Sequence, residues 1–80
     1  MILLIHHESE AVISLSKFFM EDLTLREALN MLPKISAEFA DLAGLDPVQT
    51  TDCIQSIVVG LPFVDVLPKI RALGCTLTAW

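Results

Sequence analysis

Two short apolar segments stand at opposite ends of the 80-residue sequence, and they restrict the folds that it can adopt. Met1–Ile5 is a continuous apolar run with the length of a buried strand, which is expected to end near His6 or His7. Cys75–Trp80 alternates, with Cys75, Leu77 and Ala79 on one side, as expected of a strand. Buried backbone groups need hydrogen-bond partners, so the sequence predicts that these two strands pair in one small sheet.

The chain between the strands carries signals for four to five short helices. Ser9 is a candidate N-cap for a helix over Glu10–Met20, in which apolar residues recur every three or four positions. Thr24 and Glu27 form a capping box for a second helix. Pro33 is expected to end that helix, because a proline forces the residue before it out of the helical region.

Three further helices are expected downstream. Ser36 begins one that Gly44 closes, and Asp46-Pro47 begins another that ends near Gly60. The β-branched stretch Ile57-Val58-Val59 leaves a buried strand open as an alternative. A last helix over 62–73 should be broken at Pro68, and Gly74 should end it. The predicted fold is a single helix-dominated α+β domain over residues 1–80, with helices covering one small sheet.

Composition indicates a surface that needs a partner. Apolar residues make up 54% of this chain and charged residues only 19%, against about a quarter in typical domains. A core of this modest size cannot hide all the apolar side chains, so patches of them should reach the surface. A protein partner or a second copy of the chain is the simplest cover.

Charge and hydropathy exclude other partners. The net charge of −5, with only five Lys and Arg residues, argues against nucleic-acid binding. The longest apolar run, Ile57–Val64, is far short of the roughly 20 residues of a membrane span. The N-terminus has no basic residue before its apolar run and does not match a signal peptide, so a cytoplasmic location is expected.

No cluster in the sequence predicts an enzyme, a metal site or a cofactor site. His6, His7, Glu8 and Glu10 are the only grouped metal-capable residues, and they lack the Cys or His companions of a closed zinc site. Asp52 beside Cys53 should raise the pKa of that thiol, which argues against a catalytic thiolate. We expect Cys53 and Cys75 to be reduced core thiols.

The function predicted from these observations is a non-catalytic protein–protein interaction module, a small adaptor or subunit that associates with itself. Three consecutive bulky residues on a helix cover most of its circumference, so part of Phe18-Phe19-Met20 should point outward. The other contact candidates are aromatic or apolar residues near predicted element ends. The candidates are Phe18, Phe19, Met20, Leu61, Phe63 and Trp80.

One segment pair resembles a known family. Ala11-Val12-Ile13 followed by Leu23–Ala28 resembles the C-terminal domain of the ribosomal stalk protein, in which an AVI helix leads to an L-x-L-x-E-A helix. The resemblance implies a strand-helix-helix-strand-helix-strand fold that docks partner proteins, and the related protease-adaptor fold implies the same role. This chain departs from it by an insertion around Ser36–Thr51 and by lacking a lysine-rich helix surface.

A second resemblance points to phages. Leu23–Glu27, together with Leu42–Leu45 and Asp52, is similar to phage tail-assembly chaperones, which implies a strand at Leu23–Glu27. The alternative function is therefore a phage-encoded accessory protein, either a tail-assembly chaperone or a small inhibitor of a host defence enzyme.

Overall fold

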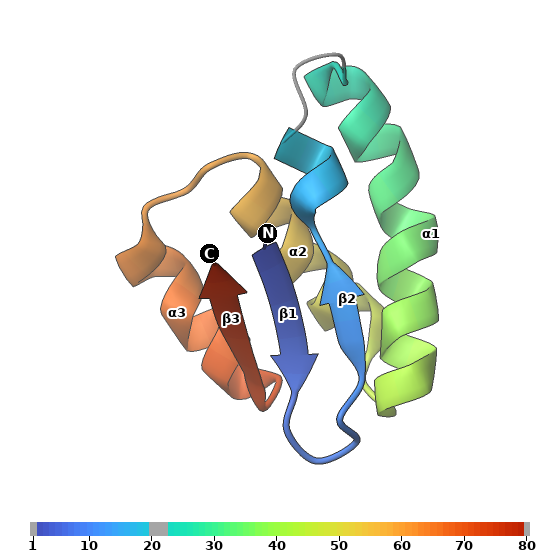
Figure 1. The fold of residues 1–80 in the computed structure, drawn as a ribbon, viewed down its shortest axis with the longest axis vertical. Coiled ribbons are helices and arrows are strands. Elements are labelled where there is room, and N and C mark those ends of the chain that lie inside the picture. The colour runs from blue at the N-terminus through green and yellow to red at the C-terminus, as the bar shows by residue number, and fades with distance from the viewer. Residues whose placement is uncertain (1, 20–22, 80) are drawn as a thin grey trace.

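A three-stranded antiparallel sheet packs against three α-helices in the computed structural model, which describes residues 2–19 and 23–79 (Figure 1). The elements along the chain are β1 (Ile2–His6), β2 (Val12–Ser14), the 3₁₀ helix η1 (Ser16–Phe19), α1 (Leu25–Ala43), α2 (Pro47–Val58), α3 (Phe63–Ala72) and β3 (Cys75–Ala79). The helix-dominated α+β class is confirmed. The described residues form three α-helices, so the predicted number of four to five is wrong.

The central strand of the sheet is β1, and the strand order is β2-β1-β3. β1 and β3 are antiparallel, with Ile2 opposite Ala79 and Leu4 opposite Leu77. The predicted pairing of the two terminal strands is therefore confirmed, while Trp80 lies outside the described residues.

The predicted helix over Glu10–Met20 is wrong, because residues 12–14 form the strand β2 instead. Glu10 has a left-handed backbone, with φ of 63°, and His6 N donates to Ala11 O at 2.8 Å, so the chain reverses direction here. Ser9 holds this turn and caps no helix: its Oγ lies 2.7 Å from His6 Nδ1 and accepts from Ala11 N at 3.2 Å. Pairing with β1 outweighs the local helical spacing, and Val12 and Ile13 are β-branched residues that suit a strand. This strand also departs from the AVI helix of the stalk-protein resemblance.

The predicted N-cap at the start of α1 is confirmed, but the reciprocal half of the capping box is not, because Glu27 accepts from the Thr24 hydroxyl and not from the Thr24 backbone N–H. Glu27 N donates to Thr24 Oγ1 at 3.2 Å, and Thr24 Oγ1 donates to Glu27 Oε1 at 3.0 Å. Thr24 has the extended backbone of an N-cap residue, so the helix begins at Leu25. The strand that the phage resemblance implies at Leu23–Glu27 is therefore wrong.

The predicted helix end at Pro33 is also wrong, because α1 continues through it to Ala43 and includes the helix expected from Ser36. Pro33 lies on the exposed side of α1, where its missing N–H costs one hydrogen bond, and the buried side with Leu32 and Phe39 continues past it. Gly44 closes the helix as predicted, with φ of 71° and its N–H directed to Ala40 O.

The two remaining helices begin near the predicted residues. Asp46 Oδ2 accepts from Gln49 N at 2.9 Å, and α2 runs on to Val58, so the alternative of a strand at 57–59 is wrong. α3 contains Pro68 without the predicted break. Pro68 leaves only the carbonyl of Val64 without its usual donor, in the exposed first turn of the helix.

The core lies between the sheet and the helices. In Figure 1 the sheet lies in front of α2, with α1 beside β2 and α3 beside β3. Leu4 is completely buried on the helix-covered face of β1, and the flanking Leu3 and Ile5 point to the other face, which no described helix covers. None of the helices in residues 2–19 and 23–79 has the length and apolar character needed to cross a lipid bilayer.

Ser36 carries a buried polar group that leads to a prediction. Its side chain is fully buried in α1, and no hydrogen-bond partner for its Oγ is present among the described residues. We expect Ser36→Ala to raise the free energy of unfolding by about 1–2 kcal/mol, because the substitution removes an unpaired hydroxyl and favours the helix. Urea unfolding measures this change, and a less stable Ser36→Ala variant would contradict it.

Candidate protein interface

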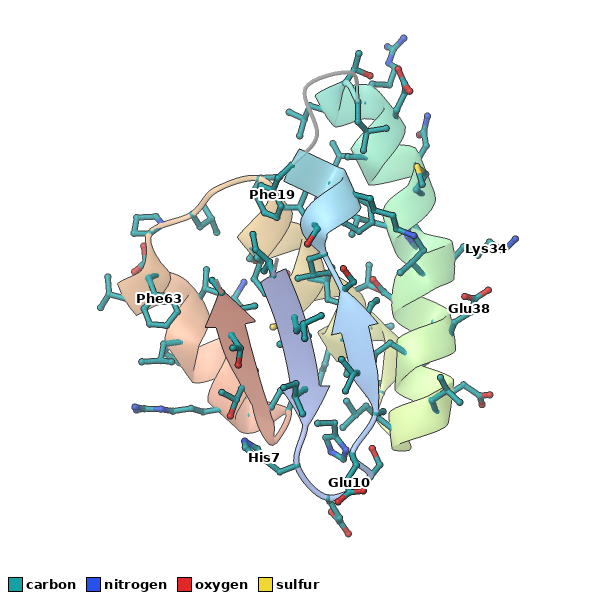
Figure 2. The ribbon with its side chains drawn as sticks, in the orientation of Figure 1. His7, Glu10, Phe19, Lys34, Glu38 and Phe63 are labelled. Atoms are coloured by element: carbon teal, nitrogen blue, oxygen red, sulfur yellow. The ribbon has the colours of Figure 1, made fainter. Side chains whose placement is uncertain are left out.

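The contact candidates from the sequence lie in different environments. Phe18 belongs to the hydrophobic core at 6% exposure, with Lys17 Nζ 5.7 Å from its ring centroid, so it leaves little surface for a partner. Phe19 is 47% exposed at the end of η1, and Phe63 is exposed at the start of α3 (Figure 2). Met20 and Trp80 lie outside the described residues.

Residues 59–64, which join α2 to α3 and include the first two residues of α3, are named here the apolar connector. Four of its large apolar side chains are between 42% and 74% exposed, and they are Val59, Leu61, Phe63 and Val64. The first half of the connector is hydrogen bonded to α2, since Val59 N donates to Gln55 O and Leu61 N donates to Ser56 O. Gly60, with φ of 82°, makes the reversal between these bonds. The connector therefore presents apolar side chains from a hydrogen-bonded backbone.

A groove of about 380 Å³ separates α3 from β3 and is named here the β3 groove. Its residues are His7, Phe63, Leu67, Ile70, Arg71, Gly74, Cys75, Thr76 and Leu77. The helix side is formed mainly by apolar side chains and the other side by the strand. Figure 2 shows Phe63 near one end of α3 and His7 at the opposite end of the sheet, so the groove runs alongside β3.

The two basic residues of α3 lie on different sides of the helix, Lys69 toward α2 and Arg71 toward the β3 groove. Lys69 forms an ion pair with Asp52 of α2 at 2.9 Å and donates to Ser56 Oγ at 3.0 Å, so its charge is matched. Arg71 lines the β3 groove, and within the described part of the chain no carboxylate lies within 4 Å of its guanidinium. The β3 groove thus contains a cationic side chain and no acidic one.

The other edge of the sheet has a smaller groove of about 300 Å³ between β2 and α1. Val12, Phe39 and Leu42 line it, together with Lys17 and Glu38, which carry opposite charges. β2 is only three residues long, against five in β3. This edge offers a shorter strand and no net charge.

The histidine pair does not gather ligands. His6 is buried on the helix-covered face, whereas His7 is exposed and its Nε2 hydrogen bonds with Thr76 Oγ1. No group of three metal-capable side chains comes together within residues 2–19 and 23–79. The two histidines therefore serve separate local contacts.

The two cysteines are buried free thiols. Burial, with smaller contributions from Cys75 and Asp52, raises the pKa of Cys53 to about 11, and burial also raises the pKa of Cys75. At neutral pH both thiols are protonated, so neither presents the thiolate that nucleophilic catalysis uses.

The raised pKa of Cys53 predicts a loss of stability at high pH. Below about pH 8 the thiol is protonated in both states, but above about pH 9 only the unfolded chain ionises, so the free energy of unfolding falls by on the order of 2 kcal/mol as the pH approaches 11. Urea unfolding from pH 7 to pH 11 (about four pH units) should show a steeper decline for the wild type than for Cys53→Ala. Equal pH slopes for the two proteins would contradict the prediction.

Phe63 is the one β3 groove residue among the contact candidates from the sequence, and the other groove residues, Leu67, Arg71 and Leu77 among them, were not identified. The alternation in Cys75–Ala79 was a usable signal for Leu77, because a strand with a single neighbour has a free edge. The position of Arg71 beside that edge depends on how α3 packs.

The chain has no match among models of known protein families, curated proteins or solved structures.

Proposed function

We propose that this chain is a non-catalytic protein-binding module that works as a small cytoplasmic adaptor or subunit and associates with itself. The observation that supports the proposal is the apolar connector, in which four large apolar side chains are exposed within six residues. Buried free thiols suit a reducing compartment such as the cytoplasm.

Burial of the connector is the source of the binding energy. Removing apolar surface from water contributes about 25 cal/mol per Å², and clustered bulky side chains give the central contacts of an interface. In the sequence, Asp65 is the acidic residue directly beside this cluster. A second copy offers the same apolar surface, and a two-fold axis through the connector covers both copies at once.

Sedimentation of three proteins tests the proposal. The wild type should sediment as a dimer at micromolar concentration, and Leu61→Asp should sediment as a monomer, because the new carboxylate is desolvated in the contact. Val48→Asp is the control: Val48 is also an apolar and exposed residue, and it lies at the start of α2, away from the connector. This control should remain dimeric. A wild type that is monomeric, or a Leu61→Asp variant that remains dimeric, would show that the proposed self-association is wrong.

A further inference from the structure

The hydrogen-bonding pattern between β1 and β3 leaves backbone groups on the outer edge of β3 without a partner strand. His7 N donates to Gly74 O at 3.0 Å, which makes His7 and Gly74 a hydrogen-bonded pair. Such pairs alternate along an antiparallel ladder, so Thr76 and Thr78 also bond to β1. The backbone groups of Leu77 and Ala79 therefore point outward, and no other strand of the described chain pairs with them.

The β3 groove lies beside this free edge, and apolar side chains of α3 line it. A chain that added to β3 would place every second side chain on the same face as Leu77, where Phe63 and Leu67 of α3 line the groove. An added strand would thus find hydrogen-bond partners on β3 and apolar contacts on α3. This is the arrangement by which peptides add to a sheet edge beside a helix.

The positive charge at one end of the groove favours an acidic residue in the part of the added chain that lies there. Arg71 and His7 lie where the groove meets Gly74, and none of the groove residues is acidic. The whole chain carries a net charge of −5, so this end is a local exception. An incoming carboxylate is favoured there by the guanidinium of Arg71.

We propose that the β3 groove binds an extended segment of a partner protein that runs antiparallel to β3. Two apolar residues, opposite Ala79 and Leu77, face α3, and an acidic residue two positions after the second of them faces Arg71. The segment forms main-chain hydrogen bonds with Leu77 and Ala79. This inference rests on the proposed protein-binding function and gives the chemistry of a partner.

A second copy of this chain fits the same edge less well. Figure 1 shows α3 beside β3 at the border of the sheet, so a copy that added its own β3 through a two-fold axis would bring its α3 against this α3. The groove volume of about 380 Å³ holds a few side chains and not a helix. The β2 edge is a weaker candidate, because it is three residues long and its groove contains both Lys17 and Glu38.

The test uses a capped seven-residue peptide with valine at positions two and four, glutamate at position six and threonine elsewhere. Added to ¹⁵N-labelled protein, it should shift the amide resonances of Leu77 and Ala79 in a saturable manner. The same peptide with lysine in place of glutamate should bind about fivefold more weakly, because an attraction to Arg71 becomes a repulsion. A third peptide with the order of the residues reversed should also bind more weakly.

Two variants make the outcome decisive. Arg71→Glu, at an exposed position, should reverse the preference between glutamate and lysine peptides. Leu61→Asp should bind the glutamate peptide at least as tightly as the wild type, because Leu61 does not line the groove and loss of the dimer leaves Phe63, which does line it, free. Peptide binding by a monomeric protein would therefore support the groove even if self-association fails.

Three results would overturn the proposal. They are no shift at millimolar peptide, shifts that map to another surface, and equal affinity of the wild type for the glutamate and lysine peptides. A dimer in which the amides of Leu77 and Ala79 are already protected from exchange would place a second copy in the groove instead.

Discussion

Leu4→Ala is expected to lower the free energy of unfolding by about 2–5 kcal/mol. Leu4 is completely buried in the central strand, where it lies opposite Ile13 of β2 and Leu77 of β3. Truncation leaves a cavity between the sheet and the helices that the backbone of a paired strand cannot close. A chain of this length has a total stability of about 4–12 kcal/mol, so the variant should lose a large fraction of it.

Leu3→Ala is the matched control for this prediction. Leu3 is the same residue type in the same strand, but it is only partly buried and faces the side of the sheet that no described helix covers. Urea unfolding followed by circular dichroism should show a much smaller loss for Leu3→Ala than for Leu4→Ala. Equal losses would mean that the second face of the sheet is also covered, for example by a partner.

Pro33→Ala is expected to raise the free energy of unfolding by about 1–3 kcal/mol. Pro33 stands in the ninth position of the 19-residue helix α1, where it removes the N–H that would bond to Leu29 O. Alanine restores that bond and relieves the contact between the proline ring and the same carbonyl. The wider unfolded ensemble of the alanine variant offsets part of this gain.

Thermal unfolding of Pro33→Ala and Lys34→Ala separates this effect from a general gain in helix propensity. Lys34 is the next residue of α1, is exposed, and has its own backbone N–H. We expect a change within about 0.5 kcal/mol for Lys34→Ala. A less stable Pro33→Ala variant would contradict the prediction and would mean that Pro33 matters for the groove that it lines together with the start of α2.

Local signals predicted the element ends that depend on local chemistry. The Thr24 N-cap and the Asp46-Pro47 start each need only neighbours within one helical turn, and both are present. The strand β2 could not be predicted in the same way, because Val12–Ser14 becomes a strand only by pairing with β1. Likewise, Pro33 ends no helix, since the buried side of α1 continues beyond it.

The surface features of the candidate interface could be predicted only in part from the sequence, for a similar reason. The exposure of Leu61 and Phe63 follows from their place at a connection between helices, which the Gly60 signal already indicated. Phe18 and Phe19 could not be told apart, because the register of η1 decides which of the two enters the core. The β3 groove joins residues 7 and 63–77, and no local pattern reports such a contact.

The pairing of β1 with β3 also decides when the sheet can form. His7 and Thr76 are 69 positions apart, so these strands meet only after a loop that includes all three α-helices has closed. Contacts of such long range are slow to form, whereas the β1–β2 hairpin and the helices need only near neighbours. During synthesis the apolar strand β1 therefore keeps an unpaired edge until Cys75–Ala79 has been made, and this interval is when the nascent chain most needs protection from aggregation.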